Sequence, residues 1–399
     1  MNSRLARAHS IADLRQMARR RLPKPIFDFV DGGAEDEVSL RHNRAVFERV
    51  RFRARTVVDV AKRSQSVDLF DRPSASPFGI APMGGLGLLW PEAEIQLVRA
   101  ASAAGIPFVL STASNTSLER VAEHAGQARL WFQLYTLNDQ RVNLSLIRRA
   151  AAAGYEALVV TTDTNMFPKR ERDRRNQFTL ALKKTPGNVF NILRHPSWLY
   201  RVGMRPGLGR MENLIGEVEG PTDPAKLVAY FMSQRNPTLD WDFLRPLREA
   251  WKGPMLLKGI MSKEEAIRAA DFGMDGVILS NHGGRNLDSA VAPFEILPEI
   301  VDAVGARLTV CLDSGFRRGS DVLKAVAMGA RMAFLGRPAA FAVAAAGPAG
   351  AEHLVALLKD EIDRVQGYLG CPTLDMLDRS YLWCDGLAAG RFHAWGENS

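Results

Sequence analysis

The hydrophobic positions of this chain form short apolar runs that recur from residue 78 onward. Each run is aliphatic or β-branched, shows no polar alternation, and ends in small or polar residues before an amphipathic, helix-like stretch begins. Eight runs follow this pattern, at residues 78–83, 107–112, 130–135, 157–163, 254–259, 276–281, 308–314 and 332–337. Runs of this kind are typical of parallel strands that are buried on both faces.

The spacing of the runs predicts the fold. Most lie about 22 to 32 residues apart, which leaves room for one strand, one helix and two loops. Eight such units predict an α/β protein with a (β/α)8 TIM barrel over residues 78–345, rather than an open, doubly wound sheet. No Gly-x-Gly-x-x-Gly motif follows the first run, which disfavours a nicotinamide-type Rossmann site.

We interpret residues 1–399 as a single domain built around this barrel. Residues 1–77 form an N-terminal extension, in which Ser10 to Asp13 resembles a capping box at the start of a helix. The interval 164–253 is a long insertion after the fourth strand. Residues 346–399 form a C-terminal helix and tail, and the amphipathic pattern places the helix at 352–369, closed by Gly370.

Composition and charge narrow the classes of partner. The chain is 46% hydrophobic and 24% charged, as in ordinary globular proteins, and its formal net charge is +8. A basic balance favours an anionic substrate with a phosphate cofactor, an acidic membrane surface or nucleic acid, although a mildly basic surface without a specific partner fits equally well. Three cysteines without metal-ligand spacing indicate a reducing compartment and no metal site. No signal peptide or membrane-spanning segment is evident, so we expect a cytoplasmic protein.

Polar chemistry gathers at the carboxyl ends of the predicted strands, where TIM barrels place their catalytic groups. Of the seven histidines, only His282 stands directly past a strand. Arg285 beside it is suited to bind a carboxylate through two hydrogen bonds, and the imidazole is then placed to take a proton from the adjacent carbon or hydroxyl. Asp163 is a candidate to orient His282 and stabilise its protonated form, with a helix N-cap as the alternative role.

The loops after the seventh and eighth strands predict a phosphate site. They combine glycines and arginines in residues 313–319 and 336–337. Glycines let backbone N–H groups approach an anion, arginines neutralise it, and these two loops are the recurrent phosphate site of TIM barrels. We therefore expect a phosphate-bearing cofactor.

Taken together, these residues resemble the FMN-dependent α-hydroxy-acid dehydrogenase/oxidase family, which includes glycolate oxidase. The resemblance is carried by SNHGGRNLD at 280–288, DSGFRRGSDVLKA at 313–325 and LGRP at 335–338, and it extends back to LPKPIFDF at 22–29. GLLWP at 87–91 and LSTASN at 110–115 are most similar to the bacterial mandelate/L-lactate dehydrogenase branch. The resemblance implies FMN-dependent oxidation of an L-2-hydroxy acid to the 2-oxo acid by a homo-oligomer, expected to be a tetramer.

The resemblance also implies a role for each site residue. His282 would be the catalytic base and Asp163 its partner, while Lys258 would stabilise the reduced flavin near N1. The substrate would be bound by Phe29, Tyr135, Arg170 and Arg285. FMN would be bound by Pro82, Met83, Gly84, Ser111, Gln133, Thr161, Lys258, Ser280, Asp313, Ser314, Gly315, Phe316, Arg317, Gly336 and Arg337.

Three positions bear on substrate and electron acceptor. Phe29 stands where the family usually has a tyrosine, and loss of that hydroxyl costs about 1 kcal/mol or more if its acceptor stays unpaired. Ala113 stands where glycolate oxidases have a tryptophan, which should widen the pocket. Gly84 stands where oxidases of the family commonly have alanine, which favours a quinone or other carrier over oxygen as the electron acceptor. The alternatives are an FMN-dependent oxidase of a bulkier or atypical substrate, a non-redox FMN barrel enzyme, and a flavin-binding accessory protein with lost or altered activity.

The long insertion interleaves arginines with leucine, tryptophan and tyrosine. Its HPSW stretch at 195–198 resembles, in place and sequence, the segment that anchors a membrane-bound member of the family. Basic and aromatic side chains favour peripheral contact of residues 182–215 with the inner face of the cell membrane. A lid over the flavin is the alternative, and nucleic-acid binding is disfavoured because no recognition motif is present.

Overall fold

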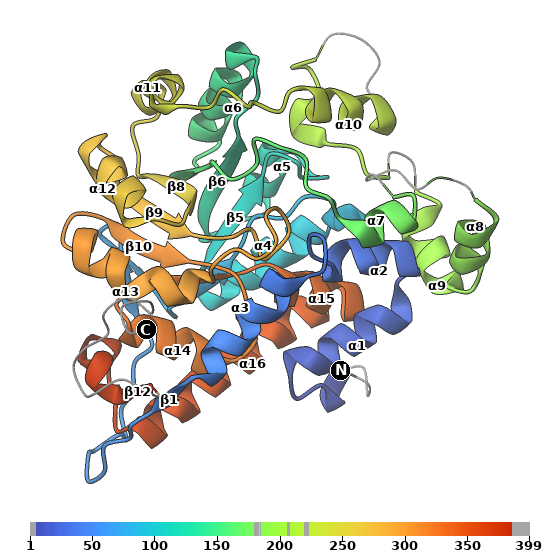
Figure 1. The fold of residues 1–399 in the computed structure, drawn as a ribbon. Coiled ribbons are helices and arrows are strands. Elements are labelled where there is room, and N and C mark those ends of the chain that lie inside the picture. The colour runs from blue at the N-terminus through green and yellow to red at the C-terminus, as the bar shows by residue number, and fades with distance from the viewer. Residues whose placement is uncertain (1–4, 179–182, 184, 206–207, 219–222, 385–399) are drawn as a thin grey trace.

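The computed structural model describes residues 5–178, 183, 185–205, 208–218 and 223–384. Eight parallel strands close into a barrel in the order β10-β11-β4-β5-β6-β7-β8-β9 (Figure 1). They are β4 (Phe78–Ile80), β5 (Pro107–Ser111), β6 (Arg129–Tyr135), β7 (Ala157–Thr161), β8 (Met255–Ile260), β9 (Gly276–Leu279), β10 (Thr309–Leu312) and β11 (Met332–Leu335). Each strand falls within or overlaps one predicted run, so the TIM barrel is confirmed.

The barrel interior is packed with side chains. The rings of Trp131 on β6 and Phe334 on β11 are 5.3 Å apart, although β4 and β5 separate their strands, so they meet across the interior. Phe70 packs against Trp131 from the turn between β2 (Val67–Leu69) and β3 (Arg72–Ser74). This hairpin also receives hydrogen bonds from Arg129 at the start of β6. It therefore covers the amino-terminal end of the barrel and leaves the carboxyl end for chemistry.

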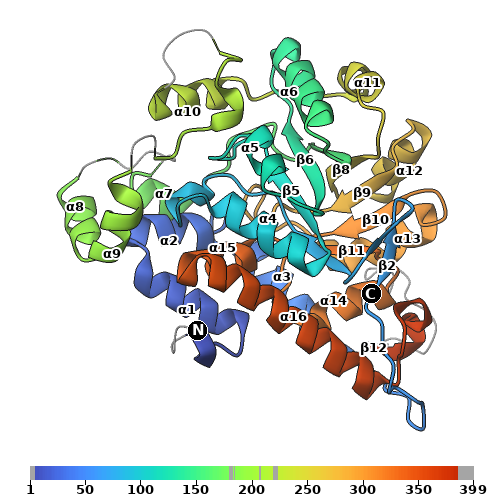
Figure 2. The same ribbon diagram turned by 180° about the vertical axis from the view of Figure 1, so that it is seen from behind.

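Eight helices follow the eight strands and surround the barrel (Figures 1 and 2). They are α4 (Ala93–Ala104), α5 (Leu118–Glu123), α6 (Gln140–Ala152), α11 (Trp241–Ala250), α12 (Lys263–Asp271), α13 (Pro293–Val304), α14 (Gly319–Ala327) and α15 (Arg337–Ala346). Their amphipathic faces cover the outward-facing apolar side chains of the strands, which are buried throughout.

The N-terminal extension consists mainly of α1 (Ile11–Arg21), α2 (Lys24–Asp31) and α3 (Val38–Glu48). The predicted cap is confirmed, because the Ser10 hydroxyl accepts a hydrogen bond from the Asp13 amide while the Asp13 carboxylate accepts one from His9 N. α2 has Pro25 in its first turn, and its last turn lies at the mouth of the barrel. The extension thus delivers Phe29 to the carboxyl end of the barrel.

The C-terminal helix α16 (Pro348–Leu369) runs along α15 and α4 on the side seen in Figure 2. The helix is closed by Gly370, as predicted, and Gly370 has a left-handed backbone conformation. The helix begins at Pro348, however, instead of residue 352. The earlier start is physically sound because proline fits the first turn of a helix. Antiparallel pairing of β1 (Val50–Phe52) with β12 (Leu382–Cys384) ties this end of the chain to the extension.

The insertion after β7 contains α7 (Glu171–Arg175), α8 (Pro186–Leu193), α9 (Pro196–Trp198) and α10 (Pro224–Ser233). α8 and α9 lie at the periphery, on the same side of the barrel as α2 (Figure 1). The barrel helix α11 also falls within 164–253, so the inserted part ends before Trp241. Among the residues described, no helix combines the length and apolar character needed to cross a bilayer.

Candidate active site

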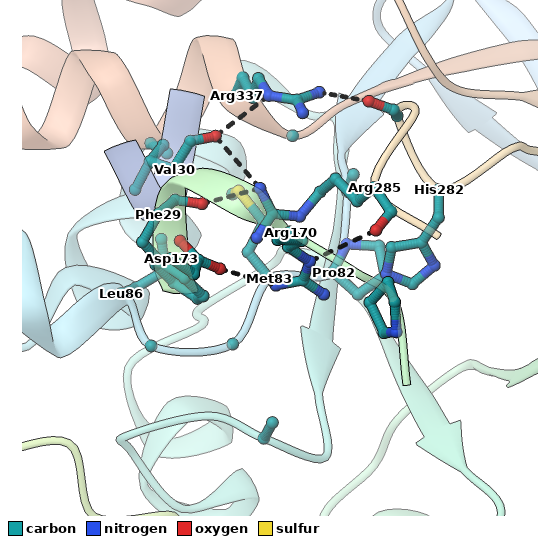
Figure 3. A pocket seen from close by; sticks show the side chains of 18 of the residues that line it. Phe29, Val30, Pro82, Met83, Leu86, Arg170, Asp173, His282, Arg285 and Arg337 are labelled. Carbon is teal, nitrogen blue, oxygen red and sulfur yellow. Dashed lines mark hydrogen bonds and ion pairs between the residues drawn. The ribbon is translucent and has the colours of Figure 1, made fainter. Parts of the chain in front are cut away.

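A cavity of about 590 Å³ lies at the carboxyl ends of the barrel strands, with α2 and the insertion completing its wall. Figure 3 shows side chains from these elements converging on it. The predicted site residues that line the cavity are Phe29, Pro82, Met83, Gly84, Tyr135, Thr161, Arg170, Lys258, His282, Arg285, Asp313, Ser314, Gly315, Phe316, Arg317, Gly336 and Arg337. Strand ends far apart in the sequence therefore supply one shared site.

His282 and Asp163 form a hydrogen-bonded pair at this cavity. The imidazole Nδ1 lies 3.1 Å from Asp163 Oδ1, while Nε2 faces the Tyr135 hydroxyl at 3.5 Å. Burial lowers the pKa of His282 despite the opposing charge of Asp163. Burial alone would raise the pKa of Asp163, but the charges of His282 and Lys258 outweigh it and hold that pKa below its ordinary value. When the neutral imidazole donates from Nδ1 to the carboxylate, Nε2 presents its lone pair toward the Tyr135 hydroxyl and the cavity.

The backbone around His282 is held in an unusual shape. His282 itself has a φ of +57°, and Gly283 and Gly284 continue in the left-handed region. A Cβ atom on Gly284 would lie 2.6 Å from the backbone N of Leu40, so only glycine allows this loop to sit against α3. The side-chain amides of Asn281 and Asn43 exchange two hydrogen bonds of 2.8 Å across the same contact.

Arg285 and Arg170 form a cationic wall beside α2. Arg285 Nη1 donates to the carbonyl oxygens of Phe29 at 2.7 Å and Gly32 at 3.0 Å, and its guanidinium lies 5.2 Å from the centre of the Phe29 ring. Arg170 donates to the Arg285 carbonyl and lies 3.7 Å from the Asp173 carboxylate (Figure 3). Burial lowers the pKa of both guanidinium groups, and for Arg285 the neighbouring arginines add to the effect. A substrate carboxylate would relieve this accumulated positive charge.

Lys258 stands at the end of β8, on the barrel side of the cavity. Its Nζ lies 2.9 Å from Asp313 Oδ2 and donates to Ser280 Oγ at 2.7 Å. Burial alone would lower the pKa of Lys258, but the carboxylates of Asp313 and Asp163 outweigh it and raise the pKa above its ordinary value. Lys258 is therefore a fixed positive charge in the wall of the cavity.

The loops after β10 and β11 place two further arginines in the cavity wall. Arg337 donates hydrogen bonds to the carbonyl oxygens of Val30, Gly283 and Gly32, and so ties α2 to the His282 loop. The Arg317 side chain donates to the Phe316 carbonyl. Burial and the nearby charges of Arg337 and Arg44 lower the pKa of Arg317 to about 9. An anion beside Arg317 would offset this unfavourable burial, as a phosphate would.

Four predicted site residues do not line the cavity but lie behind its wall. Asp163 stands behind His282, and Ser280 joins Lys258 to the backbone N–H of His282. Ser111 donates to Gln133, which donates to Thr161, each at 2.9 Å. These side chains form a hydrogen-bonded layer directly under the cavity, and direct contact of Ser111, Gln133 and Ser280 with FMN stays a prediction.

The structure also brings in residues that sequence reasoning did not select. Many come from the insertion, and the set includes Leu86, Leu89, Phe167, Asp173, Arg174, Gln177, Phe178, Lys183, Phe231, Met232 and Arg235. No periodic relation to the barrel strands identifies them, because the insertion has its own geometry. The only sequence signal for the part nearest the barrel is the aromatic and basic composition of residues 167–178.

Comparison with known proteins places this geometry in a family. A model of the FMN-dependent dehydrogenase family matches residues 18–384. The chain belongs to the FMN-dependent dehydrogenase family. It is 40% identical over 379 residues to (S)-mandelate dehydrogenase of Pseudomonas putida, covering 95% of this chain and 94% of that protein. It is 39% identical to L-lactate oxidase of a Nostoc species, covering 94% and 97%.

Solved structures agree with this assignment. The crystal structure of the monotopic membrane protein (S)-mandelate dehydrogenase superposes with a TM-score of 0.90 at 40% identity, covering 94% of this chain and 99% of that one. Membership in the FMN-dependent dehydrogenase family confirms the predicted family, the oxidoreductase class and the FMN cofactor.

The residues of this member of the FMN-dependent dehydrogenase family fit FMN. Arg317 is a buried cation whose charge nearby carboxylates offset only in part, and a phosphate would complete that compensation. Lys258 supplies a fixed positive charge that suits an electron-rich ring. Gly315 has a φ of +88°, and a Cβ there would lie 2.0 Å from the carbonyl oxygen of Asn43, so the phosphate-side loop requires glycine. Ser314, Gly315, Arg317 and Gly336 would hold the phosphate end, and Pro82 to Gly84 would lie along the ring system.

Proposed function

We propose that this protein oxidises an L-2-hydroxy acid, of lactate or mandelate type, to the 2-oxo acid. The observation that carries the proposal is the placement of the His282–Asp163 pair, Tyr135 and two arginines around one cavity. The relatives named above act on mandelate and lactate, as their names state. FMN, when bound, supplies the two-electron oxidant for such a reaction.

The chain's own side chains divide the work between binding and proton transfer. Arg170 and Arg285 bind the substrate carboxylate and so fix the orientation of the neighbouring carbon. Tyr135 and Nε2 of His282 lie on the same side of the cavity and receive the substrate hydroxyl. Nε2 takes the proton, and Asp163 stabilises the imidazolium that results.

A quinone or other carrier is our proposed electron acceptor in preference to oxygen. The support comes from Gly84, which stands where oxidases commonly have alanine. A Cβ on Gly84 would lie 2.9 Å from the Cβ of Ala113 and 3.1 Å from its carbonyl oxygen, so this wall leaves no room for a methyl group without a shift. The alternative, an oxidase of a bulkier substrate, keeps its support from Phe29, Ala113 and the size of the cavity.

The decisive experiment is anaerobic mixing of the FMN-bound protein with a panel of 2-hydroxy acids. We expect bleaching of the flavin absorbance, and we expect replacement of His282 by glutamine to slow it by about 10²- to 10⁴-fold while FMN stays bound. Reoxidation is then timed with a quinone-like dye and with oxygen, and the dye should be faster. The proposed function fails if no 2-hydroxy acid bleaches the flavin, and product formed without any acceptor would instead indicate a non-redox FMN enzyme.

We further propose peripheral contact with the inner face of the cell membrane through the middle of the insertion. The cavity-lining residues of the insertion include Phe167, Pro168, Arg170 and Phe178. In contrast, Phe190, Leu193, Tyr200 and Met204 are exposed on its outer part. Arginines alternate with these apolar side chains, which suits an anionic lipid surface. Trp198, in contrast, is buried and donates to the Leu88 carbonyl at 2.8 Å, so the HPSW tryptophan stabilises the insertion rather than the membrane contact.

The predicted homotetramer, the cytoplasmic location and the lack of nucleic-acid binding stay proposals. The likeness to the family supports the homotetramer, and the reduced cysteines expected from composition support the location. The lack of nucleic-acid binding is supported by the insertion, where several basic residues already line the cavity. Light scattering of the FMN-bound protein tests the subunit number.

A further inference from the structure

Arg235 is a cation of the active-site cavity that neither the proton transfer nor the flavin requires. It lies between α10 and α11 and lines the cavity together with Tyr135 and Phe231. Its Nη1 donates a hydrogen bond of 2.5 Å to the carbonyl oxygen of Thr164, and its guanidinium lies 5.0 Å from the centre of the Phe167 ring. Aromatic and backbone contacts thus fix its position at the wall.

The charge of Arg235 is not neutralised by the protein. Within the described part of the chain, no carboxylate forms an ion pair with Arg235, and its buried Nε has no hydrogen-bond acceptor. Burial lowers the pKa of this guanidinium, which means that the folded protein holds the charge at a cost. Such a group is favourable only when a ligand supplies negative charge or lone pairs.

Arg235 lies at a different part of the cavity wall from Arg285, which is bonded to α2. Arg235 Nη1 donates to the carbonyl oxygen of Thr164, whereas Arg285 Nη1 donates to the carbonyl oxygens of Phe29 and Gly32. Arg285 is thus held at α2, and Arg235 is held at Thr164, the residue that follows Asp163. A carboxylate held between Arg170 and Arg285 leaves Arg235 free for another group of the same substrate.

We propose that Arg235 selects 2-hydroxy acids whose side chain carries a second carboxylate. This inference rests on the proposed function, since Arg170 and Arg285 must bind the carboxylate beside the reacting carbon. The side-chain carboxylate then pairs with Arg235, and Phe167 and Phe231 pack against the carbons between the two acid groups. An acid with a neutral side chain would bring apolar contact but leave the guanidinium unpaired.

The test compares dicarboxylic substrates with neutral isosteres on the FMN-bound protein. The probes are L-2-hydroxysuccinate, L-2-hydroxyglutarate and L-2-hydroxyadipate, each against its side-chain amide, with kcat/KM for anaerobic flavin reduction as the readout. We expect the best dicarboxylate to exceed its amide by about 10- to 100-fold, the range of a charge-assisted hydrogen bond. Arg235→Met should bring this ratio close to one, and Arg235→Lys should retain part of it.

A control variant and a binding measurement separate this role from a structural one. Arg245→Met removes the same charge from α11 outside the cavity, where Arg245 lies 3.5 Å from Asp242, and should preserve the ratio. The 2-oxo products are titrated into the oxidised protein and followed by the shift in flavin absorbance, and Arg235→Met should raise the Kd of the dicarboxylate alone.

The inference is overturned if no dicarboxylate exceeds its amide, or if Arg235→Met slows both members of a pair equally. Failure of the proposed function looks different, because then no 2-hydroxy acid, neutral or charged, bleaches the flavin of the unaltered protein. That result would remove the basis of the selectivity as well.

Discussion

At the scale of single residues, the chemistry depends on the balance of charges around His282. Burial lowers its pKa and Asp163 opposes that shift, with burial the larger effect. If the base is the neutral imidazole, as we propose, activity is lost as the pH falls through the pKa of His282. Because that pKa is depressed, kcat/KM for flavin reduction should stay on its plateau below pH ~6.5, the ordinary histidine value, and fall only in more acidic solution.

Replacing Asp163 by asparagine tests the same balance. The change removes the charge that stabilises the imidazolium and allows the imidazole to adopt the wrong tautomer, so we expect kcat to fall by about 10²- to 10⁴-fold. It should also move the acidic limb of the profile to lower pH, because Asp163 raises the pKa of His282. Stopped-flow flavin reduction across a pH series measures both effects. No helix begins at Asp163, since α7 starts at Glu171 with Arg170 as its N-cap, so the alternative capping role is wrong. Rates within a few-fold of the unaltered protein would contradict the proposed support of His282 by Asp163.

The residues that sequence reasoning located are those whose position follows from the barrel. His282, Lys258 and Asp313 come at or just past the end of an apolar run, and parallel strands bring such ends together. Arg235 and Phe178 do not, because they lie in an insertion whose path no periodicity describes. Side-chain direction was also beyond reach, as with Arg337, which turns to the carbonyl oxygens of Val30 and Gly32.

At the scale of elements, the loop after β9, which carries His282, is held against α3. Periodicity located β9, but the docking of its loop on the extension depends on close backbone approach, which leaves no hydrophobic pattern. Gly284 and the paired amides of Asn43 and Asn281 make this contact. The N-terminal extension therefore supports the wall of the candidate site as well as preceding the barrel in the chain.

Gly284→Ala should break this contact. The new Cβ would meet the backbone N of Leu40 at 2.6 Å in a residue whose φ is +68°, so we expect a loss of about 2 to 4 kcal/mol in the free energy of unfolding. Thermal unfolding of the FMN-bound protein measures it, together with the rate of flavin reduction. Gly187→Ala in α8 is the matched control, because its Cβ would meet nothing within 4 Å and its φ is not positive. Equal unfolding temperatures for the two variants would contradict the docking role.

At the scale of the whole molecule, the insertion links two surfaces with different tasks. Its residues near β7 and α10 close the substrate cavity, while its outer helices expose apolar side chains between arginines. The sequence showed this composition but could not separate membrane contact from a lid, because both use aromatic and basic residues. In the structure, the cavity-lining residues and the exposed apolar side chains lie in different parts of the same segment.

The outer part of the insertion should carry the binding to anionic vesicles. Phe190 is 62% and Tyr200 78% exposed, and burying an aromatic side chain is worth about 1.5 to 3 kcal/mol, so replacing both by serine should lower vesicle partitioning by more than about 10-fold. Co-sedimentation with vesicles containing anionic lipid measures this, and added salt should weaken the arginine contribution in both proteins. Tyr368→Ser in α16 is the control, since that ring is 84% exposed and lies outside the insertion. Flavin reduction should persist in the double variant, because neither ring lines the substrate cavity.

If the double variant sediments with the vesicles as the unaltered protein does, the exposed rings do not bind the membrane. An equal loss of sedimentation in Tyr368→Ser would contradict the proposal in the same way.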